Sequence, residues 1–261
     1  MSRPIFFLTD FGLADTYVGI VKAVILRIAP DARIVDLTHE IPPQDVRAGA
    51  FALLTAAPYL PEDAVVLAVV DPGVGTARRP IAVPGGRRTF VGPDNGLLSW
   101  VVDIASGAVV LDRPGFWLPT VSATFHGRDL FGPVAAHLAR GVPLTEVGSP
   151  GGAIQTIPLP PTHRETGKDG ETVAVHGEVI HVDRYGNLIT SLTAADIPPD
   201  SVVEIHGQRI AGLAPHFQAG AGAIIALIGS AGFLEIAAPN GSARDVLSVA
   251  VGTPVRVAAA P

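Results

Sequence analysis

Apolar and polar positions alternate in blocks along the first half of the chain. Short apolar runs predict three strands, at residues 4–9, 33–37 and 64–70. The last run is apolar on both faces, which is typical of a strand inside a parallel sheet covered by helices. Apolar residues spaced three and one positions apart predict a helix at 17–28, and a second helix is expected at 45–57. This order predicts an α/β fold that begins with a layered α/β domain, residues 1–150, with a largely parallel sheet.

The pattern changes after residue 150. Before that point, weaker signals predict two more strands and two more helices, at 80–83, 89–91, 97–104 and 130–139. Residues 151–171 are rich in proline and glycine, and we interpret them as a linker. Residues 172–261 contain short β-rich runs separated by Gly, Pro and Asp turns. They predict a second, small all-β domain built as a barrel.

The composition excludes several classes of function. The chain has 261 residues, of which 48% are hydrophobic and 16% charged, so we do not expect disorder. Its formal net charge of −6 argues against a nucleic-acid partner, because a phosphate backbone needs a basic surface. The absence of cysteine excludes a thiolate metal site and a cysteine nucleophile. The apolar runs are far shorter than the roughly 20 residues of a membrane helix, and no signal peptide is indicated, so we expect a cytoplasmic protein without a membrane partner.

Polar clusters follow the predicted strands of the first domain, where ligands bind in parallel sheets. The first strand ends in Thr9 and Asp10 and is followed by neither G-x-G-x-x-G nor a P-loop. A carboxylate there repels phosphate, but it can accept hydrogen bonds from a ribose diol or bind a cation. The alternative is that Asp10 only caps a turn.

Asp71 follows the most apolar strand and begins a glycine-rich loop. Arg78, or its neighbour Arg79, can fold back and hold the carboxylate ionised in a fixed geometry. His126 precedes Gly127, which leaves space for a small ligand, and His39 is a second candidate histidine. A structural ion pair and packed histidines are the alternatives that the residues alone leave open.

Two turns of the predicted barrel also concentrate polar groups. Asp183, Tyr185 and Asn187 lie within six residues, and the segment 229–235 carries Ser230 and Glu235. Asp, Gly and Asn are favoured in ordinary turns, so each cluster taken singly needs no ligand to explain it.

Seven segments, taken together and in order, resemble the SAM hydroxide adenosyltransferase family, relatives of the fluorinases and chlorinases that attack S-adenosyl-L-methionine (SAM). They span nearly the whole chain. The segments are TDFGLADTYVG (9–19), IVDLTHEIPPQDV (34–46), VVDPGVGTARRPI (69–81), VGPDNGLL (91–98), TFHGRDLFGPVAAHLA (124–139), VDRYGNLITSL (182–192) and GSAGFLEIAAPNGSA (229–243).

The resemblance implies an enzyme that converts SAM and water to adenosine and L-methionine, by SN2 attack of an activated water at C5′. It implies that Asp71, Arg78 and His126 activate the water and that Asp10 binds the ribose hydroxyls. The remaining substrate-binding residues are expected in the second domain: Asp183, Ser230 and Glu235 at the methionine end, Tyr185 and Phe217 stacked on adenine, and Asn187 at the adenine edge. The resemblance further implies a homotrimer whose active sites combine an N-terminal domain with a neighbour's C-terminal domain. It implies neither a metal nor a cofactor.

One departure separates the two branches of this family. Halogenases have a tyrosine where this chain has Asp71, and the halide-binding serine of fluorinase falls on Gly127. The Asp71 carboxylate repels a halide, and Gly127 has no hydroxyl to bind one. The sequence therefore resembles the hydroxide branch.

Three other functions remain as alternatives. The first is a metal-dependent phosphoester or nucleotide hydrolase, whose ligands would come from Asp10, Asp15, His39, Asp71, Asp94 and His126. Arg78 beside Asp71 argues against it, since a guanidinium competes with a cation. The others are a non-catalytic SAM or adenosine binder and a trimeric scaffold with a vestigial pocket.

Overall fold

The computed structural model describes residues 2–167, 169–198, 200–219 and 224–259. The chain divides into two compact units, Met1–Ile157 and Pro158–Pro261, and each is described by itself. Among the residues described, no helix has the length and apolar character needed to cross a bilayer.

The first unit is built on one seven-stranded sheet with the order β2-β1-β3-β5-β4-β6-β7. Its strands are β1 (Ile5–Thr9), β2 (Ile34–Thr38), β3 (Val65–Val69), β4 (Pro80–Gly85), β5 (Arg88–Pro93), β6 (Ala108–Val110) and β7 (Ser149–Gly152). The β2-β1-β3-β5 part is parallel, as expected, whereas β5-β4-β6-β7 is antiparallel. The sheet is therefore mixed, and the prediction of a largely parallel sheet is wrong for half of it. The reason is local: only two residues separate β4 from β5, and so short a connection permits only an antiparallel pair.

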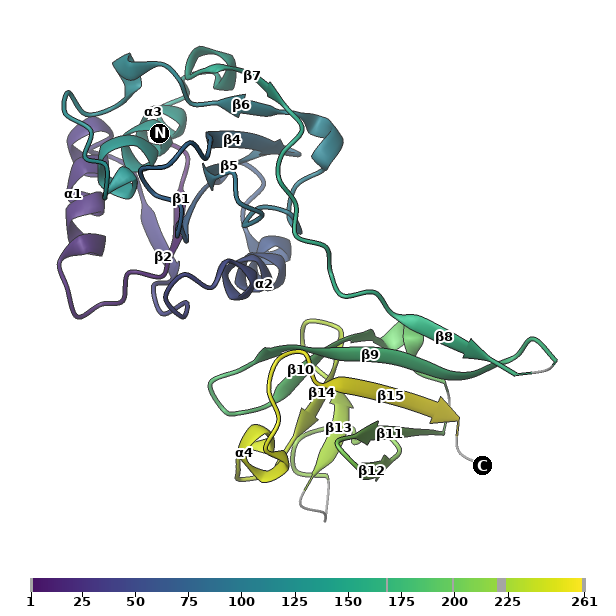
Figure 1. Cartoon of the computed structure of the whole chain (residues 1–261). Helices are drawn as coiled ribbons and strands as arrows, with labels where there is room; N and C mark the ends of the chain where they lie inside the picture. Colours follow the sequence, from purple (N-terminus) through teal and green to yellow (C-terminus); the bar gives the residue numbers. More distant parts are fainter. Residues whose placement is uncertain (1, 168, 199, 220–223, 260–261) are drawn as a thin grey trace. The chain divides into compact units, whose positions relative to one another are not determined.

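Helices cover both faces of this sheet (Figure 1). The helices are α1 (Tyr17–Ile28), α2 (Val46–Ala56) and α3 (Gly132–Ala139), with short helical turns at Ala57–Tyr59, Ile104–Ser106, Pro114–Phe116, Gly127–Phe131 and Leu144–Glu146. Alternate residues of β3 enter different cores: Leu67 packs with α1 and α3, and Ala68 packs with α2. This two-sided burial explains why the 64–70 run carries no polar residue, and it places Asp71 at the first position where the chain leaves the core.

The second unit is entirely antiparallel, with the strand order β12-β11-β15-β9-β10-β14-β13 and β8 paired to β9. Its elements are β8 (His163–Thr166), β9 (Thr172–Val182), β10 (Leu188–Thr193), a turn at Ala194–Asp196, β11 (Ser201–Ile205), β12 (Gln208–Ala211), β13 (Ile225–Ile228), β14 (Phe233–Ala237), α4 (Ala243–Leu247) and β15 (Pro254–Ala259). The long β9 pairs with β15 along one part and with β10 along another, so the sheet curls around its main hydrophobic core. The predicted barrel is found in part, since the path ends at β12 and β13 without a pairing between them in the described residues.

The segment predicted as a linker contains regular structure at both ends. β7 closes the edge of the first sheet, and β8 belongs to the second unit. Between them, the chain up to Ile157 is held to the first unit, because Ser99 and Trp100 bond its main chain.

Candidate active site

Asp71 and Arg78 form a two-pronged ion pair at the carboxyl end of β3. Arg78 Nε lies 2.8 Å from Asp71 Oδ1 and 3.0 Å from Oδ2, and Arg78 Nη2 donates to Oδ2 as well. Both side chains are more than 90% buried. Bidentate, charge-assisted bonds fix the orientation of a carboxylate as well as its charge. The loop folds back as the sequence analysis expects, and it is Arg78, not Arg79, that pairs with Asp71.

His126 joins this pair from a distant part of the chain. Its Nδ1 lies 2.9 Å from Arg78 Nη2. A guanidinium only donates hydrogen bonds, so Nδ1 is the acceptor and the neutral ring carries its hydrogen on Nε2. Burial, together with the positive charge of Arg78, lowers the pKa of His126 below its ordinary value, although Asp71 and Asp129 act in the opposite direction. His126 is therefore a neutral imidazole at pH 7.

The local backbone explains how this histidine reaches the pair. His126 immediately precedes a single π-helical turn, Gly127–Phe131, that leads into α3, and such turns are frequent at functional sites. Phe131 from this turn lies under the Arg78 guanidinium, 5.1 Å from its carbon to the ring centre. Gly75, at φ +77°, lets the 71–78 loop approach this region, because a Cβ there would lie 2.3 Å from the Ala123 carbonyl oxygen.

Asp10, Asp71 and His126 line one small cavity of about 70 Å³, together with Phe11, Val69, Val74, Thr124, Phe125 and Gly127. This volume suits one or two water molecules, each of which occupies ≈ 30 Å³ in the liquid. One oxygen of Asp10, Oδ2, accepts the Gln44 main-chain N–H at 2.8 Å. The structure thus brings two carboxylates and an imidazole, predicted separately, around a water-sized space.

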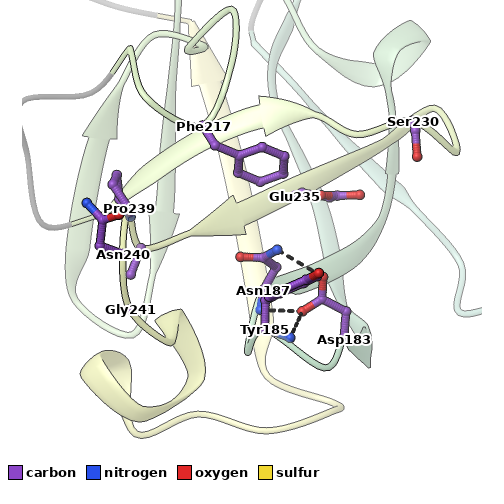
Figure 2. A pocket seen from close by; sticks show the side chains of 10 residues that line it. Asp183, Tyr185, Asn187, Phe217, Ser230, Glu235, Pro239, Asn240 and Gly241 are labelled. Atoms are coloured by element: carbon purple, nitrogen blue, oxygen red, sulfur yellow. Dashed lines mark hydrogen bonds between the residues drawn. The ribbon is translucent and has the colours of Figure 1, made fainter.

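A larger cavity of about 510 Å³ lies in the second unit (Figure 2). All six substrate-binding residues predicted there line it: Asp183, Tyr185, Asn187, Phe217, Ser230 and Glu235. The volume falls in the range of small-molecule sites. Tyr185 is 76% exposed and Phe217 is 46% exposed, so two aromatic rings are available to a planar ligand.

Acidic groups give this cavity its charge. Asp183 Oδ1 accepts the main-chain N–H groups of Tyr185 and Asn187, both at 2.8 Å, and Oδ2 accepts the Asn187 side-chain amide at 2.9 Å. Burial raises the pKa of Glu235, and the nearby charge of Asp183 raises it further. Gly229 permits this placement, since a Cβ there would collide with the Glu235 carboxylate. Two carboxylates in one cavity favour a ligand that carries positive charge.

Of the six residues of the alternative metal site, Asp15, His39 and Asp94 do not line the small cavity. Asp94 Oδ2 pairs with Arg79 Nε at 2.8 Å, His39 is buried beside Thr9, and Asp15 lines a shallow groove along α1. No cluster of three or more metal-ligating side chains occurs within the described part of the chain. The six ligands proposed from the sequence therefore do not converge on one point.

Sequence reasoning missed several residues that shape these cavities. Gln44 contributes through its main chain at φ +66°, which no side-chain pattern reveals. Pro239 and Asn240 line the larger cavity. The Pro-Asn-Gly run after the 233–237 strand is a turn signal that would have pointed to them.

Several known proteins are similar to this chain. The family described as SAM hydroxide adenosyltransferase matches with its N-terminal domain at residues 5–148 and with its C-terminal domain at residues 177–256. An (R)-S-adenosyl-L-methionine hydrolase of Thermus thermophilus is 48% identical over 98% of this chain and 99% of its own length. A fluorinase of Nocardia brasiliensis is 28% identical over 98% of this chain and 97% of its own length. A crystal structure of an uncharacterized conserved protein from Thermotoga maritima superposes with a TM-score of 0.87 at 35% identity, covering 97% of this chain and 99% of the other. The chain belongs to the SAM hydroxide adenosyltransferase family.

Proposed function

We propose that this protein hydrolyses SAM to adenosine and L-methionine by attack of water at the ribose C5′. The observation that carries the proposal is a water-sized cavity lined by Asp71, His126 and Asp10, with Arg78 bound to both Asp71 and His126. The high identity to a hydrolase supports the reaction class. Because that relative's name specifies the R form of SAM, we extend the proposal to the same epimer.

The chemical difficulty lies in the nucleophile. Methionine leaves readily from C5′, because its sulfur is a sulfonium and becomes a neutral thioether when it takes the electron pair of the C5′–S bond. Water is a very weak acid with a pKa far above 7, so it attacks slowly unless a base accepts its proton. His126 is a poor acceptor, because Nδ1 takes a hydrogen bond from Arg78 and Nε2 carries the ring hydrogen. We therefore assign proton acceptance to Asp71. Arg78 orients Asp71, and the Nε2–H of His126 can hold the water oxygen.

Substrate binding is divided between the two cavities in this proposal. Asp10 accepts hydrogen bonds from the ribose hydroxyls beside the water. In the larger cavity, Asp183, Glu235 and Ser230 bind the methionine end, whose ammonium suits the acidic lining. Tyr185 and Phe217 stack on adenine, and Asn187, whose NH₂ group is held by Asp183, binds its edge.

A halide is disfavoured as the nucleophile. Asp71 places negative charge where the halide would bind. A Cβ at Gly127 would lie 3.1 Å from the Phe11 ring, so a serine of the fluorinase type would crowd that ring. The site therefore favours water over chloride or fluoride.

The proposal extends to the oligomeric state of the protein and to its need for a metal or cofactor. Following the family resemblance, we propose a cytoplasmic homotrimer in which one subunit's N-terminal unit and a neighbour's C-terminal unit share each site. We propose that no metal or cofactor takes part.

Incubation of the purified protein with the separated SAM epimers, followed by chromatography, tests the reaction. We expect adenosine and methionine from the R epimer, in equal amounts and unchanged by a chelator. A 5′-halogenated nucleoside formed in chloride would favour the halogenase branch, and loss of activity in chelator would favour a metal-dependent hydrolase. Binding without turnover would leave a SAM binder.

A further inference from the structure

Next to Asp10 lies a connected set of polar side chains, none of which lines the small cavity. Thr9 and His39 are 0% and 2% exposed. Thr9 Oγ1 lies 2.8 Å from His39 Nδ1, and His39 Nε2 lies 3.1 Å from Asp36 Oδ1. Lys22 Nζ contacts the other oxygen of Asp36 at 2.6 Å. The set therefore runs from a charged pair at the surface to a buried hydroxyl beside Asp10.

The donors and acceptors of this set have one consistent direction. The main-chain N–H of Phe11 donates to Thr9 Oγ1 at 3.2 Å, which leaves the Thr9 hydroxyl hydrogen for His39 Nδ1. When Nδ1 accepts this hydrogen, the ring hydrogen of His39 is on Nε2, which lies 3.1 Å from Asp36 Oδ1 at an ion-pair distance but without hydrogen-bond alignment. Burial works against ionisation of Asp36, but hydrogen bonds from Lys22 and His39 hold its pKa below the ordinary value. An ionised carboxylate at the end of the chain stabilises this tautomer.

A carboxylate, an imidazole and a hydroxyl in this order also occur in hydrolases that use a serine or threonine nucleophile. That role does not fit here. Thr9 has no exposed surface, and its hydroxyl is already engaged by both His39 and the Phe11 amide. The set acts on the backbone around it.

We infer that Asp36, His39 and Thr9 are positioning residues that hold the carboxylate of Asp10 in place for the ribose of the substrate. The inference rests on the proposed function of Asp10 and adds the residues that act through it. Thr9 precedes Asp10 and its hydroxyl bonds Phe11, while the His39 carbonyl accepts the Gly12 N–H at 2.7 Å. The turn that carries Asp10 is thus tied on both sides to the β2 end of the sheet.

The His39 ring is itself held in place. It packs edge-on against Phe7, with ring centres 4.8 Å apart, inside the sheet. From this base, Asp10 and its neighbour Phe11 reach the small cavity, and Asp10 is the charged one of the two. Binding is stronger when a recognition group is already in its bound geometry, because less freedom is lost on association. Removal of the Thr9 hydroxyl should therefore weaken substrate binding more than it slows the chemical step.

The test compares Thr9→Val, which keeps the side-chain shape but removes the hydroxyl, with Thr9→Ser, which keeps the hydroxyl. We expect Thr9→Val to raise the KM for SAM about tenfold, equivalent to ~1.4 kcal/mol, with kcat within about threefold of the parent. Thr9→Ser should stay close to the parent in both constants. Thr89→Val is the matched control: Thr89 is buried in β5 and accepts a bond from Arg3, and it lies at the opposite end of the parallel strands from Thr9.

Two outcomes would overturn the inference: a KM of Thr9→Val equal to that of Thr89→Val, or a loss confined to kcat. A second readout is the preference for adenosine over 2′-deoxyadenosine, measured by calorimetry. We expect Asp10→Ala to lose this preference and Thr9→Val to lose most of it, and the double variant should lose no more than Asp10→Ala alone. Additive losses would mean that Thr9 acts independently of Asp10.

If Thr9→Val fails to fold, Asp36→Asn replaces it, because the Asp36 side chain is 40% exposed and its replacement should leave the fold intact. We expect a rise in KM of about threefold, since the contact of Asp36 with His39 is weakened. An unchanged KM would contradict the inference.

Nitrogen-15 NMR of the histidines tests the inference independently of the proposed function. The His39 ring should carry its hydrogen only on Nε2 whether or not SAM is hydrolysed. A hydrogen on Nδ1 would rule out the proposed contacts from Thr9 through His39 to Asp36. A parent protein that turns over no SAM would refute only the proposed function.

Discussion

At the scale of single residues, the account depends on which group accepts the proton of the attacking water. Arg78 occupies Nδ1 of His126, and it also binds both oxygens of Asp71. A carboxylate has about four acceptor positions, so Asp71 can still receive a water hydrogen, whereas the imidazole has no free acceptor nitrogen. The two residues therefore have different functions although they line the same cavity.

Replacement of each residue separates these functions. Asp71→Asn removes the base, and we expect kcat to fall about 10³-fold, within the usual contribution of proton transfer. His126→Asn keeps an acceptor for Arg78, and we expect a loss of only about tenfold, the scale of one hydrogen bond. Steady-state kinetics of both variants, with SAM binding measured in parallel, shows which variant loses more kcat. A larger loss in His126→Asn would assign the proton to the histidine.

The pH profile gives an independent check on His126. Burial and the charge of Arg78 lower its pKa from 6.5, so the neutral ring persists below that pH in the folded protein. We expect kcat/KM to stay constant from pH 8 down through pH 6.5 and to fall only in more acidic solution, where protonation puts an N–H against Arg78. His126→Asn should remove that acidic fall. A decline that begins well above pH 6.5 would show that the pKa is raised.

At the scale of elements, the site depends on a close approach between the 71–78 loop and the segment that leads to His126. Gly75 provides it in two ways: its φ of +77° and the space beside the Ala123 carbonyl, where a Cβ would lie at 2.3 Å. Gly86 has a similar φ of +67°, but nothing lies within 4 Å of a Cβ built there. Substitution at Gly86 would add only backbone strain, whereas substitution at Gly75 would add both strain and a steric clash.

Alanine at each position measures that difference. We expect Gly86→Ala to cost about 1 kcal/mol of unfolding free energy, the usual scale for an unfavourable φ. Gly75→Ala should cost ~2 kcal/mol or more, since overpacking adds to the strain, and it should also lower kcat because the loop carries Asp71 and Arg78. Denaturant unfolding and kinetics together provide the test. Equal losses of stability with unchanged turnover of SAM would show that this contact does not shape the site.

The elements also show what could be predicted from the sequence. The helix 17–28 was predicted well because one buried face imposes a spacing of three to four residues. The strand 64–70 was predicted well because burial on both faces leaves a continuous apolar run. The helix predicted at 97–104 is absent: the chain makes turns there, and Ser99 and Trp100 bond Ile157 instead. The antiparallel direction of β4 was missed although the short connection between the strands predicted at 80–83 and 89–91 could have indicated it, since a parallel pair needs a crossover of about a dozen residues or more.

Local sequence patterns also have a limit at the site. Arg78 is seven residues from Asp71, so a loop argument could pair them. His126 is 48 residues from Arg78, and no local pattern could bring them together. Only the family resemblance placed the histidine there. The positioning role of His39 was also missed, since its partners come from two strands and its own sequence neighbours are unremarkable.

At the scale of the whole molecule, the residues assigned to chemistry lie in one unit and most of those assigned to binding lie in the other. If neighbouring subunits share each site, two inactive variants can complement each other. Co-expressed Asp71→Asn and Asp183→Ala chains should regain about a quarter of the parental sites, because random assembly pairs an intact N-terminal unit with an intact C-terminal unit that often. Activity of the mixed assemblies, with their mass from light scattering, checks this. A mixture no more active than its components would contradict shared sites.

Hydrolysis of SAM in water enriched in oxygen-18, followed by mass spectrometry of the adenosine, tests the central claim most directly. The account predicts one heavy oxygen in each new adenosine, bound at C5′, with none in methionine. Adenosine that contains only ordinary oxygen, or a label in methionine instead, would contradict attack of water on that carbon.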